Sequence, residues 1–241
     1  MIICDRVSKE FPGGGGIRDI SLQFEPGKVY GIIGANGAGK TTLLRCLEGL
    51  YGLSGGSVTH DGVSTTGEKA FKEIRQHISY LPTEDYLYPG LSCRENILLA
   101  SMLRGGGSTL SADTEELIRL LGAGEFLDKP FDQCSTGMKK KAQIIASMAS
   151  IAGLAGDIRT LIWDEPNDGL DIMANIRIKE LLAGRREKGN TVIVSSHVIE
   201  FLEHFIDICI IIHEGRILDI RGGREIPSLV AHYLDLIGAQ S

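Results

Sequence analysis

The amino-acid sequence predicts an α/β fold with a mainly parallel sheet, and three observations support this class. Short apolar runs typical of buried strands alternate with helical patterns over much of the chain. A glycine-rich segment, GIIGANGAGKTT at residues 31–42, continues from one of these runs. An acidic pair, Asp164 and Glu165, closes another run. The alternation sets the fold class, and the two polar segments mark a candidate site.

Local sequence patterns place the individual elements. The expected strands lie at residues 2–7, 21–24, 29–33, 78–81, 161–163, 192–194 and 208–212. Helices are expected at residues 41–47, 171–182 and 198–205. We expect the N-terminal strands to form an antiparallel β region beside the parallel sheet. The glycine-rich segments 13–16 and 53–57 are expected to be turns.

The middle of the chain has a different pattern. From about residue 85 onward it is helical, and the glycine run 105–107 separates two helical stretches at 94–103 and 111–121. We interpret residues 85–156 as a helical subdomain inserted into one domain that spans 1–241. Its α/β nucleotide-binding core is then formed by residues 1–84 and 157–241. The small, glycine-rich segment 149–156 predicts a longer helix or an extra loop.

Composition narrows the class of protein. The chain has 241 residues, enough for a substantial core, and a formal net charge of -6, which weakly disfavours general nucleic-acid binding. Its five cysteines are scattered without paired spacing, which indicates a reduced, cytoplasmic compartment. No apolar run approaches the length of about 18 residues that a membrane-spanning helix needs. Any membrane-embedded part is therefore expected to come from another chain.

The glycine-rich segment fits a phosphate-binding loop. Gly34, Gly39, Lys40 and Thr41 satisfy the pattern GxxxxGK[ST], in which backbone N–H groups surround phosphate oxygens. We expect Lys40 to reach the β- and γ-phosphates and the Thr41 hydroxyl to coordinate Mg²⁺. Glycine is expected in this loop because side chains would block the approach of the ligand. The residues assigned to nucleotide binding in this segment are Asn36, Gly37, Gly39, Lys40, Thr41 and Thr42.

The acidic pair supplies the complementary chemistry. Asp164 is placed to hold Mg²⁺ through its water shell, and Glu165 is placed to accept a proton from the attacking water. An acidic pair at a strand end is more often a turn or a helix cap. The presence of the phosphate loop in the same chain favours the catalytic interpretation here.

Over nearly its whole length the chain resembles the nucleotide-binding subunit of an ATP-binding cassette (ABC) transporter. The segment CSTGM at residues 134–138 is similar to the family signature LSGGQ, with Ser135 and Gly137 at matching positions. The resemblance implies that this motif opens a helix and contacts the γ-phosphate across a dimer interface. It also implies that Phe11 stacks on adenine and that His197 contacts the γ-phosphate, although a turn aromatic and a capping histidine are the ordinary alternatives.

Several positions depart from the family pattern. Thr83 stands where a metal-contacting glutamine is usual, and Glu84 follows it, so we assign Glu84 as a candidate metal ligand. Thr136 and Met138 replace two signature residues, in a style similar to bacterial exporters of drugs, peptides or bacteriocins. These departures leave open which side chain takes over from the glutamine.

The expected function is an ATPase that binds Mg·ATP and drives a separate transmembrane permease, as part of an exporter on the inner face of the cell membrane. The resemblance implies a homodimer or a heterodimer with a related ATPase chain. One alternative is a soluble cassette ATPase acting on a protein scaffold, as in iron–sulfur cluster assembly. A second alternative is a nucleic-acid-associated cassette, although no nucleic-acid partner is expected from the charge and the short insert.

Overall fold

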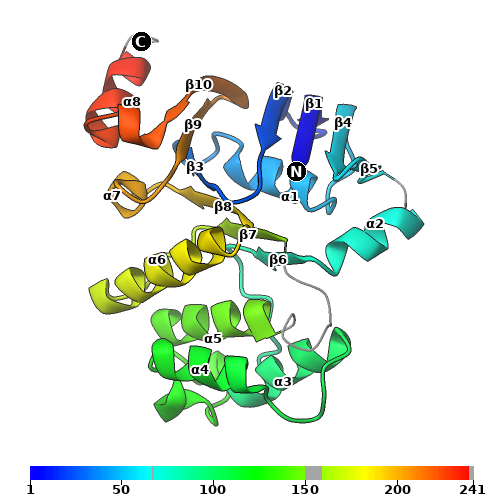
Figure 1. The fold of residues 1–241 in the computed structure, drawn as a ribbon, viewed down its shortest axis with the longest axis vertical. Helices are drawn as coiled ribbons and strands as arrows, with labels where there is room; N and C mark the ends of the chain where they lie inside the picture. The colour runs from blue at the N-terminus through cyan, green and yellow to red at the C-terminus, as the bar shows by residue number, and fades with distance from the viewer. Residues whose placement is uncertain (67, 150–158, 239–241) are drawn as a thin grey trace.

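The computed structural model describes residues 1–66, 68–149 and 159–238, which form two sheets and a helical region (Figure 1). The larger sheet has the strand order β10-β9-β3-β8-β7-β6, and the smaller one has the order β2-β1-β4-β5. All neighbours in the larger sheet are parallel except β9 and β10. Its strands are β3 (Val29–Ile33), β6 (Ile78–Leu81), β7 (Thr160–Asp164), β8 (Thr191–Ser196), β9 (Ile208–His213) and β10 (Arg216–Gly222).

The smaller sheet is antiparallel, as the sequence predicts. Its strands are β1 (Ile2–Glu10), β2 (Gly16–Phe24), β4 (Gly55–His60) and β5 (Val63–Ser64). The first helix, α1 (Lys40–Leu47), packs between the two sheets, because Leu43, Leu44 and Leu47 share one buried apolar cluster with side chains of both. The helix that follows the phosphate loop is thereby fixed on both sides.

The central strand β3 is buried along its whole length. Because side chains alternate across a strand, Val29 and Ile33 enter one apolar cluster while Tyr30 and Ile32 enter the other. A continuous apolar run is the pattern expected of a parallel strand that is covered on both faces. The sheet therefore holds its carboxyl edge, where the candidate loops lie, on a rigid and fully packed base.

Three helices gather at one end of the molecule, below β6 and β7 (Figure 1). They are α3 (Cys93–Leu103), α4 (Ala112–Leu120) and α5 (Thr136–Ala149). Ser92 and Glu95 form a capping box at the start of α3, which satisfies backbone N–H groups that the helix itself cannot bond. As the signature resemblance implies, α5 begins directly after Ser135. The domain boundaries at residues 85 and 156 stay a prediction.

The remaining helices lie on the α/β core. They are α2 (Glu68–Arg75), α6 (Ile172–Glu187), α7 (Ile199–Leu202) and α8 (Leu229–Gly238). Asp171, expected as the first residue of a helix, is instead the N-cap of α6, where its carboxylate accepts the Ala174 N–H at 2.7 Å. The helix expected at 198–205 ends earlier, because Glu203 is extended and His204 takes a left-handed φ of 60°.

Other elements are corrections to the sequence-based assignment. The sequence predicts a turn at 53–57, but residues 55–57 belong to β4, which pairs with β1 from Ile2 opposite His60 to Ser8 opposite Gly55. Strands β5 and β10 and helices α2 and α8 have no counterpart in the prediction. The longer helix or loop predicted at 149–156 lies almost wholly outside the described residues.

Candidate functional site

The phosphate loop joins β3 to α1, and its glycines are required first by the protein's own backbone. A Cβ at Gly34 would lie 2.5 Å from the Ile212 carbonyl oxygen, and Gly39 has a left-handed φ of 109° with Ile17 Cγ2 only 2.9 Å from an added Cβ. Gly215 N–H donates to the Ala38 carbonyl at 2.9 Å. The loop is therefore shaped by the β9–β10 turn beside it. At these two positions glycine is needed for the protein's own packing as well as for the expected approach of the ligand.

Lys40, the first residue of α1, is folded into the site. Its Nζ donates to the Gly34 carbonyl at 2.8 Å and to the Ala35 carbonyl at 3.4 Å, and lies 3.3 Å from Glu165 Oε1. The side chain is 6% exposed. A buried ammonium needs an anionic partner, and here the Glu165 carboxylate provides it.

The strand end at β7 meets the loop through Asp164. This residue is fully buried, and its Oδ2 accepts the Thr41 hydroxyl at 2.6 Å while its Oδ1 accepts the Ser195 hydroxyl from β8. A carboxylate and a hydroxyl oxygen side by side are the hard oxygen ligands that Mg²⁺ prefers. The donor set at Thr41 and Asp164 therefore fits the predicted metal.

Glu165 lies at the turn that follows β7, with an unusual backbone. Its φ is 50°, a conformation that costs a non-glycine residue about 1–3 kcal/mol, and its N–H donates to both the Ser195 hydroxyl and carbonyl oxygens at 3.1 and 3.2 Å. These two bonds to β8 hold the turn in place. The strained backbone directs the carboxylate back over the loop, toward Lys40.

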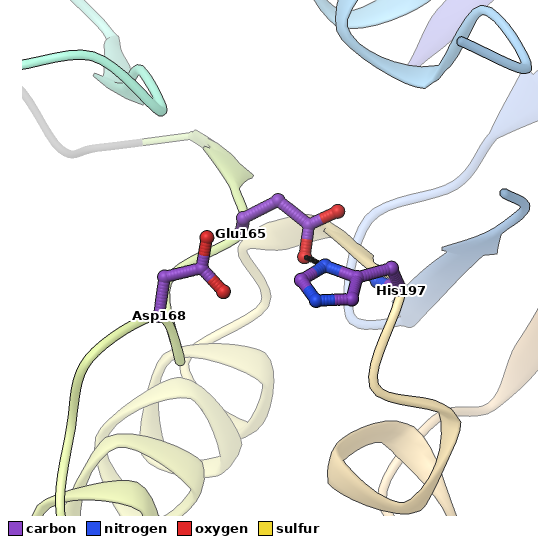
Figure 2. Close-up of side chains that lie close together, drawn as sticks. All are labelled: Glu165, Asp168 and His197. Atoms are coloured by element: carbon purple, nitrogen blue, oxygen red, sulfur yellow. Dashed lines mark hydrogen bonds and ion pairs between the residues drawn. The ribbon is translucent and has the colours of Figure 1, made fainter. Parts of the chain in front are cut away.

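His197 and Asp168 face the same carboxylate (Figure 2). Glu165 Oε2 accepts the His197 backbone N–H at 3.0 Å and lies 2.9 Å from its Nδ1. One ligand atom of each of the three side chains lies within 4.8 Å of the others. Burial, and after it the charge of Glu165, raise the pKa of the Asp168 carboxyl. The arrangement concentrates negative charge beside one histidine and one lysine.

Except for the fully buried Asp164, which joins the loop through Thr41, these groups line one pocket of about 370 Å³. It is lined by Gly16, Ala35, Asn36, Gly37, Gly39, Lys40, Thr41, Thr42, Thr83, Glu165, Asp168 and His197. Every nucleotide-binding residue assigned to the phosphate loop from the sequence is in this set. Asp168 and Thr83 had no assigned role, although the sequence shows Asp168 within the acidic segment and Thr83 at the glutamine position. Ser195 was also missed, because a serine inside a buried strand carries no local signal of function.

Three residues that the family resemblance assigns to nucleotide binding do not line this pocket. Phe11 is 36% exposed at the end of β1 and meets the Tyr51 ring edge-on, with centroids 5.5 Å apart. Ser135 is exposed, and Gly137 packs close to Gly169, whose carbonyl oxygen would lie 2.7 Å from a Cβ at Gly137. These three residues lie outside the pocket lining, so the structure leaves their predicted roles untested.

Glu84 is also directed elsewhere. Thr83 lines the pocket, whereas both Glu84 carboxylate oxygens accept hydrogen bonds from Arg45 Nη2 on α1. To hold a metal in the pocket, the Glu84 carboxylate would have to leave this ion pair. This conformation places Thr83, and not Glu84, beside the phosphate loop, and which of the two takes over from the glutamine stays a prediction.

A loop of this shape at the carboxyl edge of a parallel sheet, with a buried aspartate against its threonine, defines the chain as a P-loop nucleotide-binding protein. The family model described as ABC transporter matches residues 17–168. The ABC transporter ATP-binding protein NatA of Bacillus subtilis is 33% identical over 211 residues, covering 87% of this chain and 82% of NatA. The chain belongs to the ABC transporter family and is an ATP-binding subunit with ATPase activity coupled to transport.

Two further comparisons agree with this assignment. The lantibiotic transport ATP-binding protein SrtF of Streptococcus pyogenes is 32% identical over 203 residues, covering 84% of this chain and 82% of SrtF. The fold also matches the dimeric structure of MJ0796, a bacterial ABC transporter cassette. That match has a TM-score of 0.81 and 23% identity, and covers 93% of this chain and 99% of that one. At this identity the structural match shows the fold alone.

Proposed function

We propose that this chain binds Mg·ATP, closes on a second cassette, and drives a separate transmembrane subunit that exports its cargo. One contact carries the proposal: Lys40 Nζ lies 3.3 Å from Glu165 Oε1 inside the pocket. It joins the lysine of the phosphate loop to the carboxylate assigned as general base. Without nucleotide these two charges neutralise each other.

ATP binding would redistribute these charges. The phosphate oxygens compete with Glu165 for the Lys40 ammonium, and the backbone N–H groups at the start of α1 face the same ligand. Thr41 and Asp164 would hold Mg²⁺, which would supply positive charge to neutralise the phosphates. Once released from Lys40, Glu165 can accept a proton from water, while His197 Nδ1 orients its carboxylate. The geometry thus supports positioning and charge neutralisation as the main contributions of the protein.

The pocket of one chain lacks the signature residues, which supports a composite site. Ser135 is exposed and precedes the first turn of α5, where N–H groups without partners in the helix favour an anion. We propose that Ser135 and Gly137 of one cassette contact the γ-phosphate bound by another. The MJ0796 cassette, whose fold this chain shares, forms a dimer, which supports this arrangement for the present chain.

The membrane partner is proposed from three observations. Among the described residues, no helix combines the length and apolar character needed to cross a bilayer. Tyr88, in the loop before α3, is 60% exposed, and the surface of this loop is the proposed contact for the permease. The exporter assignment is supported by the signature substitutions Thr136 and Met138 and by the name of SrtF, which refers to lantibiotic transport. The chain would then sit on the inner face of the membrane.

A reconstitution experiment tests the proposal. A tagged chain is expected to co-purify from detergent-solubilised membranes with a polytopic protein, and that protein in liposomes should stimulate Mg²⁺-dependent ATP hydrolysis by the chain. Tyr88→Ala should weaken the stimulation and leave the unstimulated rate unchanged. Capture of a water-soluble scaffold that stimulates hydrolysis without any membrane protein would contradict the transport proposal and favour the scaffold alternative.

A further inference from the structure

The Arg45–Glu84 ion pair joins α1 to the loop that follows β6. Arg45 Nη2 donates to both Glu84 oxygens, and its Nη1 donates to the Tyr51 hydroxyl at 2.7 Å. The Arg45 side chain is 20% exposed and that of Glu84 is 61% exposed. One side of the guanidinium is therefore held by Tyr51, independently of the loop. A preorganised guanidinium loses little conformational freedom when it binds a carboxylate.

The same loop is tied to α5 by separate contacts. Gln143 Nε2 donates to the Glu84 carbonyl at 3.3 Å and to Asp85 Oδ1 at 3.0 Å. Lys139 Nζ donates to Asp85 Oδ2 at 2.9 Å. Residues 84 and 85 thus contact α1 through one side chain and α5 through a carbonyl and a second side chain. Thr83, directly before them, faces the pocket.

These contacts join two helices whose first residues belong to the two halves of the proposed composite site. Helix α1 begins with Lys40 and Thr41, and α5 begins directly after Ser135. A shift of the 83–85 loop would change where Thr83 lies relative to the pocket and how α5 is held against the core. Partial burial acts to raise the pKa of the Glu84 carboxyl, but hydrogen bonding from Arg45 and other favourable contacts outweigh it, so the pKa is lowered.

We propose that Arg45 and Glu84 form a positioning pair that holds Thr83 at the phosphate pocket and couples α1 to α5. This inference rests on the proposed roles of the pocket residues in Mg·ATP hydrolysis, and it replaces the assignment of Glu84 as a metal ligand. Glu84 then acts on the site through the loop. A partly exposed ion pair contributes at most about 1 kcal/mol to folding, so its loss should affect loop position more than global stability.

The test uses single substitutions and a charge exchange. Glu84→Gln and Arg45→Gln should each lower kcat about tenfold, which corresponds to about 1.4 kcal/mol, and change the Kd of a fluorescent ATP analogue less than about twofold. The double variant Arg45→Glu with Glu84→Arg should recover most of the lost kcat. The matched control is Asp128→Asn, which breaks the exposed Arg94–Asp128 pair, 2.7 Å long, outside the pocket. This control should retain the wild-type kcat.

A second readout does not depend on activity. Amide hydrogen exchange of residues 83–88 in nucleotide-free protein should be faster in Glu84→Gln than in wild type, and unchanged in Asp128→Asn. A Glu84→Gln variant with wild-type kcat and wild-type amide hydrogen exchange would overturn the inference. A loss of kcat in the single variants that the charge-swapped double variant does not recover would also overturn it. A separate result tests the proposed roles of the pocket residues. They fail if the wild-type protein shows no Mg²⁺-dependent ATP hydrolysis, or if Glu165→Gln does not remove that hydrolysis.

Discussion

Two regions of this chain differ in how many of their polar groups have partners within the chain. They are the phosphate end, formed by the phosphate loop with Asp164 and Glu165, and the signature end, formed by Ser135 and Gly137. At the phosphate end, Asp164 is fully buried and hydrogen-bonded, and Lys40 and Glu165 are paired with each other. At the signature end, Ser135 is exposed and lies outside the pocket. One end is closed by contacts within the chain, whereas the other presents a helix start to its surroundings.

From this difference we expect ATP binding and ATP hydrolysis to depend on different regions of the chain. The buried end has the residues expected to bind a nucleotide without help from another chain. In the proposed composite site, the residues of the exposed end act on a nucleotide that another cassette brings. We therefore expect substitutions at the phosphate end to act within each molecule, and substitutions at the signature end to act on the partner's site.

The largest expected effects are at the phosphate end. Lys40→Ala should weaken ATP binding about 100-fold, because a buried charge-assisted contact with the phosphates is lost. Glu165→Gln should keep binding but lower kcat about 1,000-fold, because the proposed general base is removed. Equilibrium binding of a fluorescent ATP analogue and steady-state phosphate release measure the two effects. Lys129→Ala, on an exposed loop, is the control.

A specific result would break this division of labour. If Glu165→Gln hydrolysed ATP at the wild-type rate, the Lys40–Glu165 contact would be only a structural ion pair. If Glu165→Gln instead bound ATP more tightly and accumulated as a dimer in light scattering, the distinction between binding and turnover would be sharpened.

A complementation experiment tests the signature end. Lys40→Ala lacks a working phosphate loop but keeps Ser135, whereas Ser135→Arg keeps the loop and blocks the signature. Each variant alone should be inactive. An equal mixture should recover about a quarter of the wild-type rate, because about half of the dimers are mixed and each mixed dimer has one intact composite site. Phosphate release measured against mixing ratio gives the result.

The outcome of the mixture distinguishes two assemblies. Recovery shows that two copies of this chain complete each other. A mixture that stays inactive at every protein concentration, while wild type is active, would contradict a homodimeric site and would require a related partner chain.

The smallest expected effect concerns Glu48, a buried carboxyl group at the C-terminus of α1. Glu48 caps the C-terminus of α1, and burial raises its carboxyl pKa from 4.5 to about 7, although Arg75 and Arg104 act to lower it. Because the folded-state pKa is raised, the stability associated with the neutral form is present below about pH 4.5 and is lost as the pH rises through 7. Glu48→Gln should therefore stabilise the protein at pH 8 by roughly 1–3 kcal/mol and by less than half of that at pH 5.

Urea unfolding at the two pH values measures this difference. Glu116→Gln, at an exposed position of α4, is the matched control and should change stability equally at both. An equal effect of Glu48→Gln at pH 5 and pH 8 would show that Glu48 is ionised throughout the range. Its ion pair with Arg75, now 3.6 Å long, would then outweigh its burial.

The sequence predicted much of the phosphate end because local chemistry specifies it. A strand followed by GxxxxGK[ST], and an acidic pair after a second strand, depend on residues that are neighbours in the chain. The 2.6 Å contact between Thr41 and Asp164 shows that the two segments meet, and their joint action on Mg·ATP stays a prediction. The predicted parallel sheet and the antiparallel N-terminal region are also confirmed, because the apolar strands that form them are visible as local runs in the sequence.

What the sequence did not show depends on distant partners. The orientation of Glu84 is decided by Arg45, on another element, and the backbone of Glu165 is held by Ser195 on β8. Strand β4 forms because β1 offers it a hydrogen-bonding edge, which outweighs its glycine-rich composition. These side-chain orientations, backbone conformations and strand pairings depend on tertiary contacts, so the residue pattern of one segment cannot predict them.

The packing of the phosphate loop against the β9–β10 turn has a consequence for synthesis of the protein. The groups that shape the loop at Ala38 and Gly34 are Gly215 N–H and the Ile212 carbonyl, and they are translated about 180 residues after it. Domains fold as units while chains leave the ribosome at about 5–20 residues per second. A nascent chain would therefore carry its nucleotide motif for roughly 10 to 35 seconds before the site could take its final shape. Until then, the ribosome-bound chain would be unable to bind ATP in the way the finished protein does.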